Sequence, residues 1–169
     1  ITADEKIDDP TVEIAGNSVT AENNDGDATS WQAEYTLKSS DTEGGISYSI
    51  DYHDLAGNSG DQYSVIADNS EVTFDNTAPS DYSVAIENET INKDNPDNMT
   101  FDLSGGDSNY NYSYTIEDEA GNSIEKDGSL NSAEQSFSED VSNLGDGTLT
   151  LSLTLSDAAG NIGEEETET

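Results

Sequence analysis

The amino-acid sequence predicts an all-β fold built from antiparallel β-sandwiches. Short runs of alternating apolar and polar residues recur along the chain, and Gly, Asn and Asp gather between the runs. Alternation of this kind is typical of strands with one buried face, and many short strands separated by turn residues favour a sandwich. No segment has the pattern of a convincing amphipathic helix, and residues 131–144 can hold at most one helical turn.

The clearest strand is predicted at 147–157, where "GTLTLSLTLSD" places four leucines on one face and Thr and Ser on the other. Residues 30–40 alternate in the same way and align Trp31, Ala33, Tyr35 and Leu37. Residues 46–54 align Ile46, Tyr48, Ile50 and Tyr52. Further strands are predicted at 11–15, 62–74, 82–87, 99–104 and 110–117.

The charge balance excludes two classes of partner. The chain has 38 acidic residues and 4 lysines and arginines, which gives a formal net charge of -34. Binding to nucleic-acid phosphates or to an anionic bilayer surface requires basic residues, so we expect neither partner. No stretch approaches the ~18 apolar residues of a membrane-spanning helix. Divalent cations or high salt are expected to offset the repulsion between so many carboxylates.

The domain boundary is predicted within "TFDNTAPSDYSVAI", residues 73–86, where one strand ends and another begins after a short connector that contains Pro79. This predicts two domains, 1–77 and 78–169. The second domain has a normal length for a sandwich. The first is short, and "ITADEKI" resembles the tail of a strand already under way, so we expect this sandwich to lack its first strand. An opening without Met suggests a piece of a longer protein.

The sequence Asp-x-Ala-Gly-Asn occurs three times, at 54–58, 118–122 and 157–161, each time after a predicted strand. Glycine can adopt the positive φ of a tight reversal. The Asn tolerates left-handed geometry, and the Asp can accept hydrogen bonds from loop amides. We therefore interpret the motif primarily as a hairpin turn.

Calcium binding is the functional alternative for this motif. Ca²⁺ takes six to eight oxygen ligands, so the Asp and Asn of one turn are too few. In a sandwich, however, the 157–161 loop would lie at the same end as the N-terminal connector and the 104–109 loop. This predicts a Ca²⁺ site that fixes the angle between the domains, with the ligands Asp75, Asp107, Asp157 and Asn161. Their spacing matches neither the EF-hand nor the nonapeptide calcium repeat.

Longer stretches of the chain resemble a known family. "WQAEYTLKSSDTEGGISYSIDYHDLAGNSG" and "VTFDNTAP" in the first half, and "DVSNLGDGTLTLSLTLSDAAGN" in the second, are similar to bacterial Ig-like (BIG-type) tandem repeats of large cell-surface adhesins. The resemblance covers nearly the whole chain. It implies tandem Ig-like antiparallel β-sandwiches that extend a binding or anchoring module from the cell, often stiffened by calcium.

The resemblance also has one departure. Repeats of the first type carry an opening strand before "ADEKI", and this chain lacks it. Two explanations remain open: the fragment begins within a domain, or a neighbouring chain supplies the strand, as in a filament joined by strand complementation. In either case the first domain is expected to expose an unpaired edge.

His53 and a group of three tyrosines are the candidate residues for catalysis and for sugar binding. His53 is the chain's one histidine and has the pattern of a solvent-facing strand residue; no nucleophile elbow or zinc-binding His pair accompanies it. Tyr110, Tyr112 and Tyr114 share one face of a predicted strand, which either packs into the core or, if exposed, stacks against sugar rings. Trp31 is expected in the core of the first domain.

The sequence thus predicts a non-enzymatic extender of an extracellular, cell-surface adhesin. Its expected partners are neighbouring Ig-like repeats of the same or an identical chain, with a surface glycan or host molecule bound through other domains. A self-assembling filament subunit is the alternative, and a carbohydrate-binding module is the second alternative.

Overall fold

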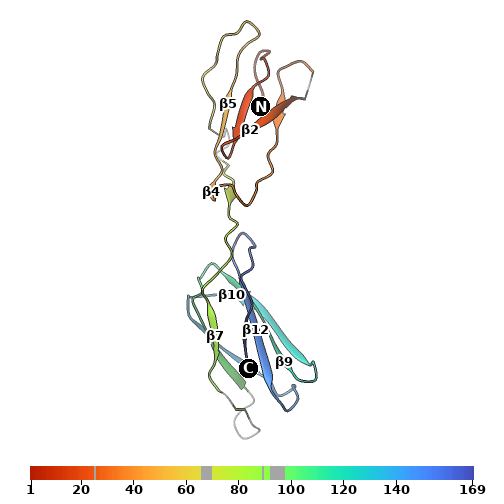
Figure 1. Cartoon of the computed structure of the whole chain (residues 1–169), viewed down its shortest axis with the longest axis vertical. Coiled ribbons are helices and arrows are strands. Elements are labelled where there is room, and N and C mark those ends of the chain that lie inside the picture. The colour runs from red at the N-terminus through yellow and green to blue at the C-terminus, as the bar shows by residue number, and fades with distance from the viewer. Residues whose placement is uncertain (25, 66–69, 89, 92–97) are drawn as a thin grey trace. The chain divides into compact units, whose positions relative to one another are not determined.

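The computed structural model describes residues 1–24, 26–65, 70–88, 90–91 and 98–169 (Figure 1). The chain divides into unit 1, Ile1–Asn76, and unit 2, Thr77–Thr169. All regular structure in the described residues is strand, and all of its strand pairings are antiparallel. The predicted all-β sandwich fold is therefore confirmed. In the described part of the chain, no helix has the length and apolarity needed to cross a membrane.

The described residues of unit 2 form a sandwich of two sheets. One sheet has the strand order β10–β9–β12–β13 and the other has the order β11–β8–β7. Their bounds are β7 Ser83–Ile86, β8 Asn98–Ser104, β9 Asn111–Asp118, β10 Ser123–Ser129, β11 Gln135–Asp140, β12 Leu149–Ser156 and β13 Glu166–Glu168. The long strands β9 and β12 lie next to each other in the first sheet and pair along their whole length.

The core of unit 2 lies between these two sheets. It is built from the inward-facing residues of strands whose burial alternates, as in the buried positions of β12 and β8. Phe101 is central to it: its ring packs edge-on against Tyr114 with 5.0 Å between centroids, and stacks on Phe137 at 4.9 Å. Tyr114 is buried and Tyr112 is half-buried against the same cluster. The tyrosine-bearing face of β9 therefore packs into the core.

Unit 1 has a four-stranded sheet of order β3–β2–β1–β5 and a separate two-stranded ladder of β4 and β6. The bounds are β1 Thr11–Ile14, β2 Asn17–Asn23, β3 Trp31–Ala33, β4 Gly44–Gly45, β5 Tyr48–Asp51 and β6 Thr73–Phe74. Ile1 exchanges two backbone hydrogen bonds of 2.9 Å with Trp31, so the first residues run along the outer edge of β3.

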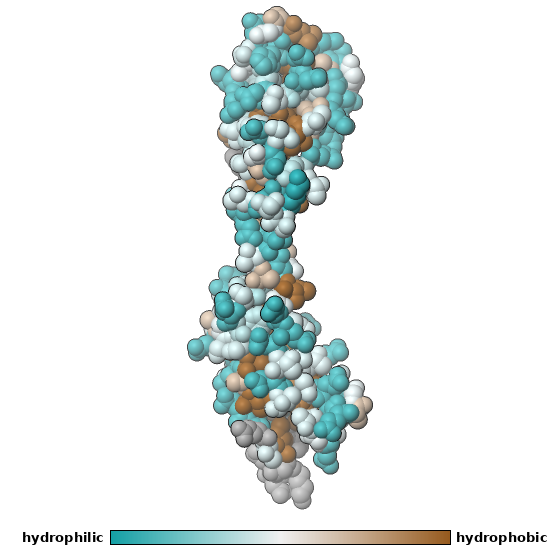
Figure 2. Space-filling view, viewed as in Figure 1, coloured by the Kyte–Doolittle hydropathy of each residue, from teal (hydrophilic) through white to brown (hydrophobic). Residues whose placement is uncertain are grey.

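Unit 1 buries little apolar surface. Among its described residues, the buried apolar side chains are Ile7, Pro10, Val12 and Trp31, whereas Leu55 is 68% exposed and Val72 is 59% exposed. The prediction that Trp31 is a core residue is confirmed. The inner face of the sheet lines an open groove of about 420 Å³, with apolar walls from Val12, Ile14, Trp31, Ala33, Tyr48 and Ile50. Hydrophilic residues cover most of the face shown in Figure 2, with small hydrophobic patches between them.

Several strand predictions require correction. The strand expected at 30–40 ends at Ala33, although the burial alternation continues through Tyr35 and Leu37. The strand expected at 46–54 is limited to β5. Within 62–74 the described residues form only β6 and a bridge between Tyr63 and Ile50, and residues 66–69 lie outside the described part. Residues 131–144 contain β11 instead of a helical turn, and the strands β2, β4, β10 and β13 were not predicted.

We expect Leu153→Ala to lower the free energy of unfolding by about 2–5 kcal/mol, because Leu153 is 0% exposed in the centre of β12 and its removal leaves a cavity. Urea denaturation followed by far-UV circular dichroism measures this change. Ile162→Ala is the control, because Ile162 is 67% exposed and its truncation is expected to change stability by less than about 0.5 kcal/mol. Equal effects of the two substitutions would contradict the assignment of the core.

Candidate functional site

Each copy of the repeated motif forms the same three-residue hairpin loop. The Asp118 N–H donates to the carbonyl oxygen of Asn122 at 3.0 Å, and the Gly121 N–H donates to the carbonyl of Asp118 at 3.1 Å. The other two copies repeat both bonds. The three motif glycines have φ of 88°, 85° and 92°, the left-handed geometry that closes a type I turn with a bulge. The hairpin-turn prediction is confirmed.

The side chains of the motif complete the turn. Asp54 Oδ1 accepts the backbone N–H groups of Ala56 and Asn58 at 2.8 Å each, and Asp54 Oδ2 accepts the side-chain amide of Asn58 at 2.6 Å. In the second copy the corresponding distances are 2.9, 2.9 and 2.7 Å. In the third copy, Asp157 accepts the Asn161 backbone N–H at 2.9 Å and its amide at 2.8 Å. The Asp and Asn of each motif therefore hold each other in place.

A related stretch shows what the aspartate contributes. Residues 13–17 also contain Ala-Gly-Asn, but Glu13 stands where the motif has Asp. There Ala15 and Gly16 both have positive φ, 51° and 72°, and form a two-residue turn between β1 and β2. Two consecutive residues with positive φ are typical of a type I′ hairpin. The three-residue loop therefore occurs where an aspartate is present to accept the loop amides.

Hydrogen bonds to the charged carboxylate lower the pKa of all three motif aspartates. The largest cause in each copy is the side-chain amide of the motif Asn. The pKa of Asp118 falls furthest, to about 2, because the N–H of Gly145 adds a further hydrogen bond to its carboxylate. These groups therefore stay charged although Asp118 and Asp157 are buried.

Asp118 also connects two loops of unit 2. It is only 4% exposed, and its Oδ2 accepts the Gly145 N–H at 2.7 Å. The neighbouring Glu119 accepts the Thr148 N–H at 3.3 Å. The β11–β12 loop is thus held against the β9–β10 turn by two adjacent carboxylates. The sequence did not predict this contact, because Gly145 is 27 residues away from Asp118 along the chain.

The four predicted calcium ligands belong to three segments of the chain. Asp157 and Asn161 are brought together in one turn, as described above. Asp107 lies in the β8–β9 loop, where it is exposed and accepts the Asn109 N–H at 2.9 Å. Asp75 is an exposed residue at the end of unit 1. Over the described ranges, no three His, Cys, Asp or Glu side chains form a group that could hold a metal ion. Calcium binding at this junction stays a prediction.

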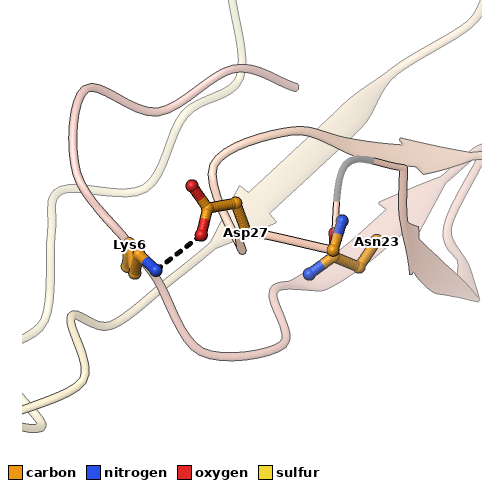
Figure 3. A network of polar contacts seen from close by, with 4 residues as sticks. Lys6, Asn23 and Asp27 are labelled. Carbon is orange, nitrogen blue, oxygen red and sulfur yellow. Dashed lines mark hydrogen bonds and ion pairs between the residues drawn. The ribbon is translucent and has the colours of Figure 1, made fainter.

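Two other carboxylates have local partners in unit 1. Asp41 accepts the Tyr35 hydroxyl at 2.9 Å and the Lys38 N–H at 2.8 Å, and the latter bond is the largest cause of its lowered pKa. Asp27 pairs with Lys6 at 2.6 Å, next to the turn where Asn23 accepts the Gly26 N–H (Figure 3). The pair is exposed to solvent, so its contribution to stability is small. His53 is exposed, as predicted.

Comparison with known proteins finds a likeness among solved structures. No family model matches the chain, and no curated protein matches it. Among solved structures, a tetra-tandem repeat in the extending region of a large adhesion protein is similar at 19% sequence identity and a TM-score of 0.47. The match covers 99% of this chain and 42% of that protein, so the chain spans less than half the length of the structure it matches.

We expect Asp118→Asn to lower the free energy of unfolding more than Asp54→Asn does. Each substitution removes the carboxylate charge from one copy of the motif turn, but only Asp118 also accepts a hydrogen bond from Gly145. The measurement is the urea midpoint of each variant as a function of pH. The pKa of Asp118 is about 2 in the folded protein and about 3.9 for an unfolded aspartate. Its contribution is therefore complete above the unfolded value and is lost as pH falls from about 4 to about 2. A difference from wild type that does not shrink between pH 4 and pH 2 would contradict this role.

Proposed function

We propose that this chain is a structural extender of an extracellular, cell-surface adhesion protein. The observation that carries the proposal is the use of the repeated motif. Its aspartates accept hydrogen bonds from their own turns, so the most repeated feature of the sequence serves the architecture of two successive β-units. The resemblance of the sequence to adhesin repeats supports the same function.

The charge distribution supports a spacer rather than a self-associating module. A formal net charge of -34 places strong repulsion between copies of the chain and keeps them apart at low salt. The strand β13, with the sequence Glu-Thr-Glu, adds charge at the edge of its sheet, which disfavours pairing with the sheet of another chain. A carbohydrate-binding function through the tyrosine-bearing face of β9 has no such support, because Tyr114 is buried there.

Calcium at the junction of the units belongs to this proposal. Ca²⁺ would neutralise some of the acidic residues and stiffen the connector between the units, and its candidate ligands remain Asp75, Asp107, Asp157 and Asn161. The support is the excess of carboxylates, together with the preference of Ca²⁺ for carboxylate and amide oxygens. Asp157 would offer only what its turn leaves open, because both of its oxygens already accept hydrogen bonds.

We expect millimolar Ca²⁺ to raise the melting temperature above its value in chelator by more than Mg²⁺ at the same ionic strength, since a ligand that binds only the folded state stabilises it. Asp75→Asn and Asp107→Asn are expected to reduce the rise. Asp127→Asn, a change of the same kind in exposed β10, is the control and should leave it unchanged. An equal rise with NaCl alone would indicate screening of the carboxylates and would contradict the calcium site.

A filament subunit is the second candidate function, and a specific observation favours it. The sheet of unit 1 leaves an open apolar groove, and Trp31 Nε1, which is buried, has no hydrogen-bond acceptor among the described residues. A strand from another copy could cover the groove and supply a backbone carbonyl. The eleven residues that line this groove carry no charged side chain, although a quarter of the chain is charged, so the groove itself would not repel the segment.

Sedimentation velocity over a wide concentration range distinguishes the two functions. For a spacer we expect a monomer at every concentration, both at low salt and in 1 M NaCl, where the repulsion is screened. Growth with concentration that Ala33→Glu abolishes would instead support the filament, because Ala33 lines the groove. Thr20→Glu is the matched control, because Thr20 lies exposed on the opposite face of the sheet.

A further inference from the structure

The first and last strands of unit 2 run side by side in the same direction. Pro79 lies against Gly163, so that a Cβ on Gly163 would be 2.5 Å from the Pro79 carbonyl oxygen. Three residues further on, Tyr82 contacts Glu164. Next, β7 packs against β13, and Ala85 and Glu168 line one cavity. In these successive contacts the residue number rises along both segments, so β7 and β13 run parallel to each other. Each of them is the edge strand of its own sheet.

One side chain joins these two segments. The Tyr82 hydroxyl donates to the carbonyl oxygen of Glu164, and it accepts the buried N–H of Leu155 in β12 at 3.3 Å. Tyr82 itself is buried and immediately precedes β7. Its hydroxyl therefore links the sheet that contains β7 to both the last segment of the chain and the central strand of the other sheet.

The parallel arrangement determines how a load acts on unit 2. In an extender, tension enters through the connector before β7 and leaves through the end of β13. Because the strands are parallel, the two pulled ends lie at opposite ends of the pair and the force slides one strand along the other. All contacts between them then resist together. Antiparallel terminal strands would instead be pulled apart from one end, one contact at a time.

We propose that Tyr82 is a mechanical latch that holds β7 to the C-terminal segment when unit 2 is under tension. This inference rests on the extender function proposed above. Tyr82 lies one residue before the ladder between β7 and β8 begins at Ser83, so its hydroxyl meets the load before that ladder does. Gly163 is part of the latch, because the absence of a side chain lets the last segment approach Pro79 and the Tyr82 ring.

The chain contains a matched control for this latch. Tyr114 also links the two sheets through its hydroxyl, which donates to Glu139 of β11 at 2.6 Å. This bond joins β9 to β11, on strands that do not carry either end of the unit. Tyr82→Phe removes a hydrogen bond next to the loaded strands β7 and β13, whereas Tyr114→Phe removes one between β9 and β11, which do not carry the load directly.

The test is single-molecule stretching of the full chain from its two ends, with Tyr82→Phe and Tyr114→Phe compared with wild type. Unit 2 is identified by its longer extension on unfolding. We expect Tyr82→Phe to raise the unfolding rate of unit 2 at a given force on the order of ten-fold, the factor for hydrogen bonds lost at the loaded strands. Tyr114→Phe should change this unfolding rate less than two-fold, even where it lowers the urea midpoint as much as Tyr82→Phe does. Gly163→Ala is a second latch variant and should also raise the rate.

The outcomes separate this inference from the function on which it rests. If wild-type unit 2 resists force and Tyr82→Phe and Gly163→Ala unfold at the wild-type rate, the latch is overturned and the extender function is unaffected. Equal rate increases in Tyr82→Phe and Tyr114→Phe, in proportion to their urea midpoints, would likewise reduce Tyr82 to an ordinary stabilising contact. Wild-type unit 2 that unfolds at forces no higher than those for unit 1 would count against the load-bearing function itself.

Discussion

The carboxylate that accepts hydrogen bonds from its own turn is the interaction on which the rest of this structure depends. A chain with 38 acidic residues has few basic partners for them, and charged groups lose their hydration when they are buried. In the Asp-x-Ala-Gly-Asn turn, backbone N–H groups and one side-chain amide replace the water around the charge. The fold can therefore place Asp118 and Asp157 in buried positions without neutralising them. In the β9–β10 hairpin the turn continues directly into the ladder, because the pair Asp118 and Asn122 is followed by the pair Glu117 and Ser123, so a local interaction sets the register of this hairpin.

The two units show how much core such a chain can build. Unit 2 surrounds Phe101 with fully buried leucines, isoleucine and methionine from three strands, and it tolerates the acidic surface around this core. Unit 1 has the same kind of turn and the same alternation, but its sheet has one apolar face covered only in part. The difference lies in the number of strands that close the second layer: three longer strands in unit 2, against the short ladder of β4 and β6 in unit 1. Turn chemistry is therefore sufficient for hairpins, whereas a closed core needs a complete second sheet.

The sequence predicted the strands whose apolar face is buried, and it missed those that are held mainly by backbone pairing. In β12 and β8 the alternation of Leu, Met and Phe is strict, because these residues fill the core. In β10 one Ile is accompanied by Ser, Glu, Lys and Asp, and β13 is Glu-Thr-Glu, so neither carries an apolar pattern. Their positions follow from long-range pairing with β9 and β12. The turn was predictable because its residues are adjacent, whereas the contacts of Asp118 with Gly145 and of Tyr82 with Glu164 join residues far apart in the chain.

The polar contacts between the sheets of unit 2 fix how the strands are positioned along their axes. A buried hydroxyl that donates to one strand and accepts from another fixes their relative position along the strand axis, which apolar packing alone leaves free to slide. Tyr82 supplies such a contact where the chain enters and leaves the unit, and the Tyr114 hydroxyl donates a single bond from β9 to Glu139 of β11. The negative charges of Glu164, Glu165 and Glu166 repel one another and disfavour close packing of the last segment. Burial is the largest cause of the raised pKa of Tyr82, and these negative charges raise it further by disfavouring a charged phenolate beside them. A directional bond at this position therefore adds to the pairing of β13 with β12 in holding so acidic a segment on the sandwich.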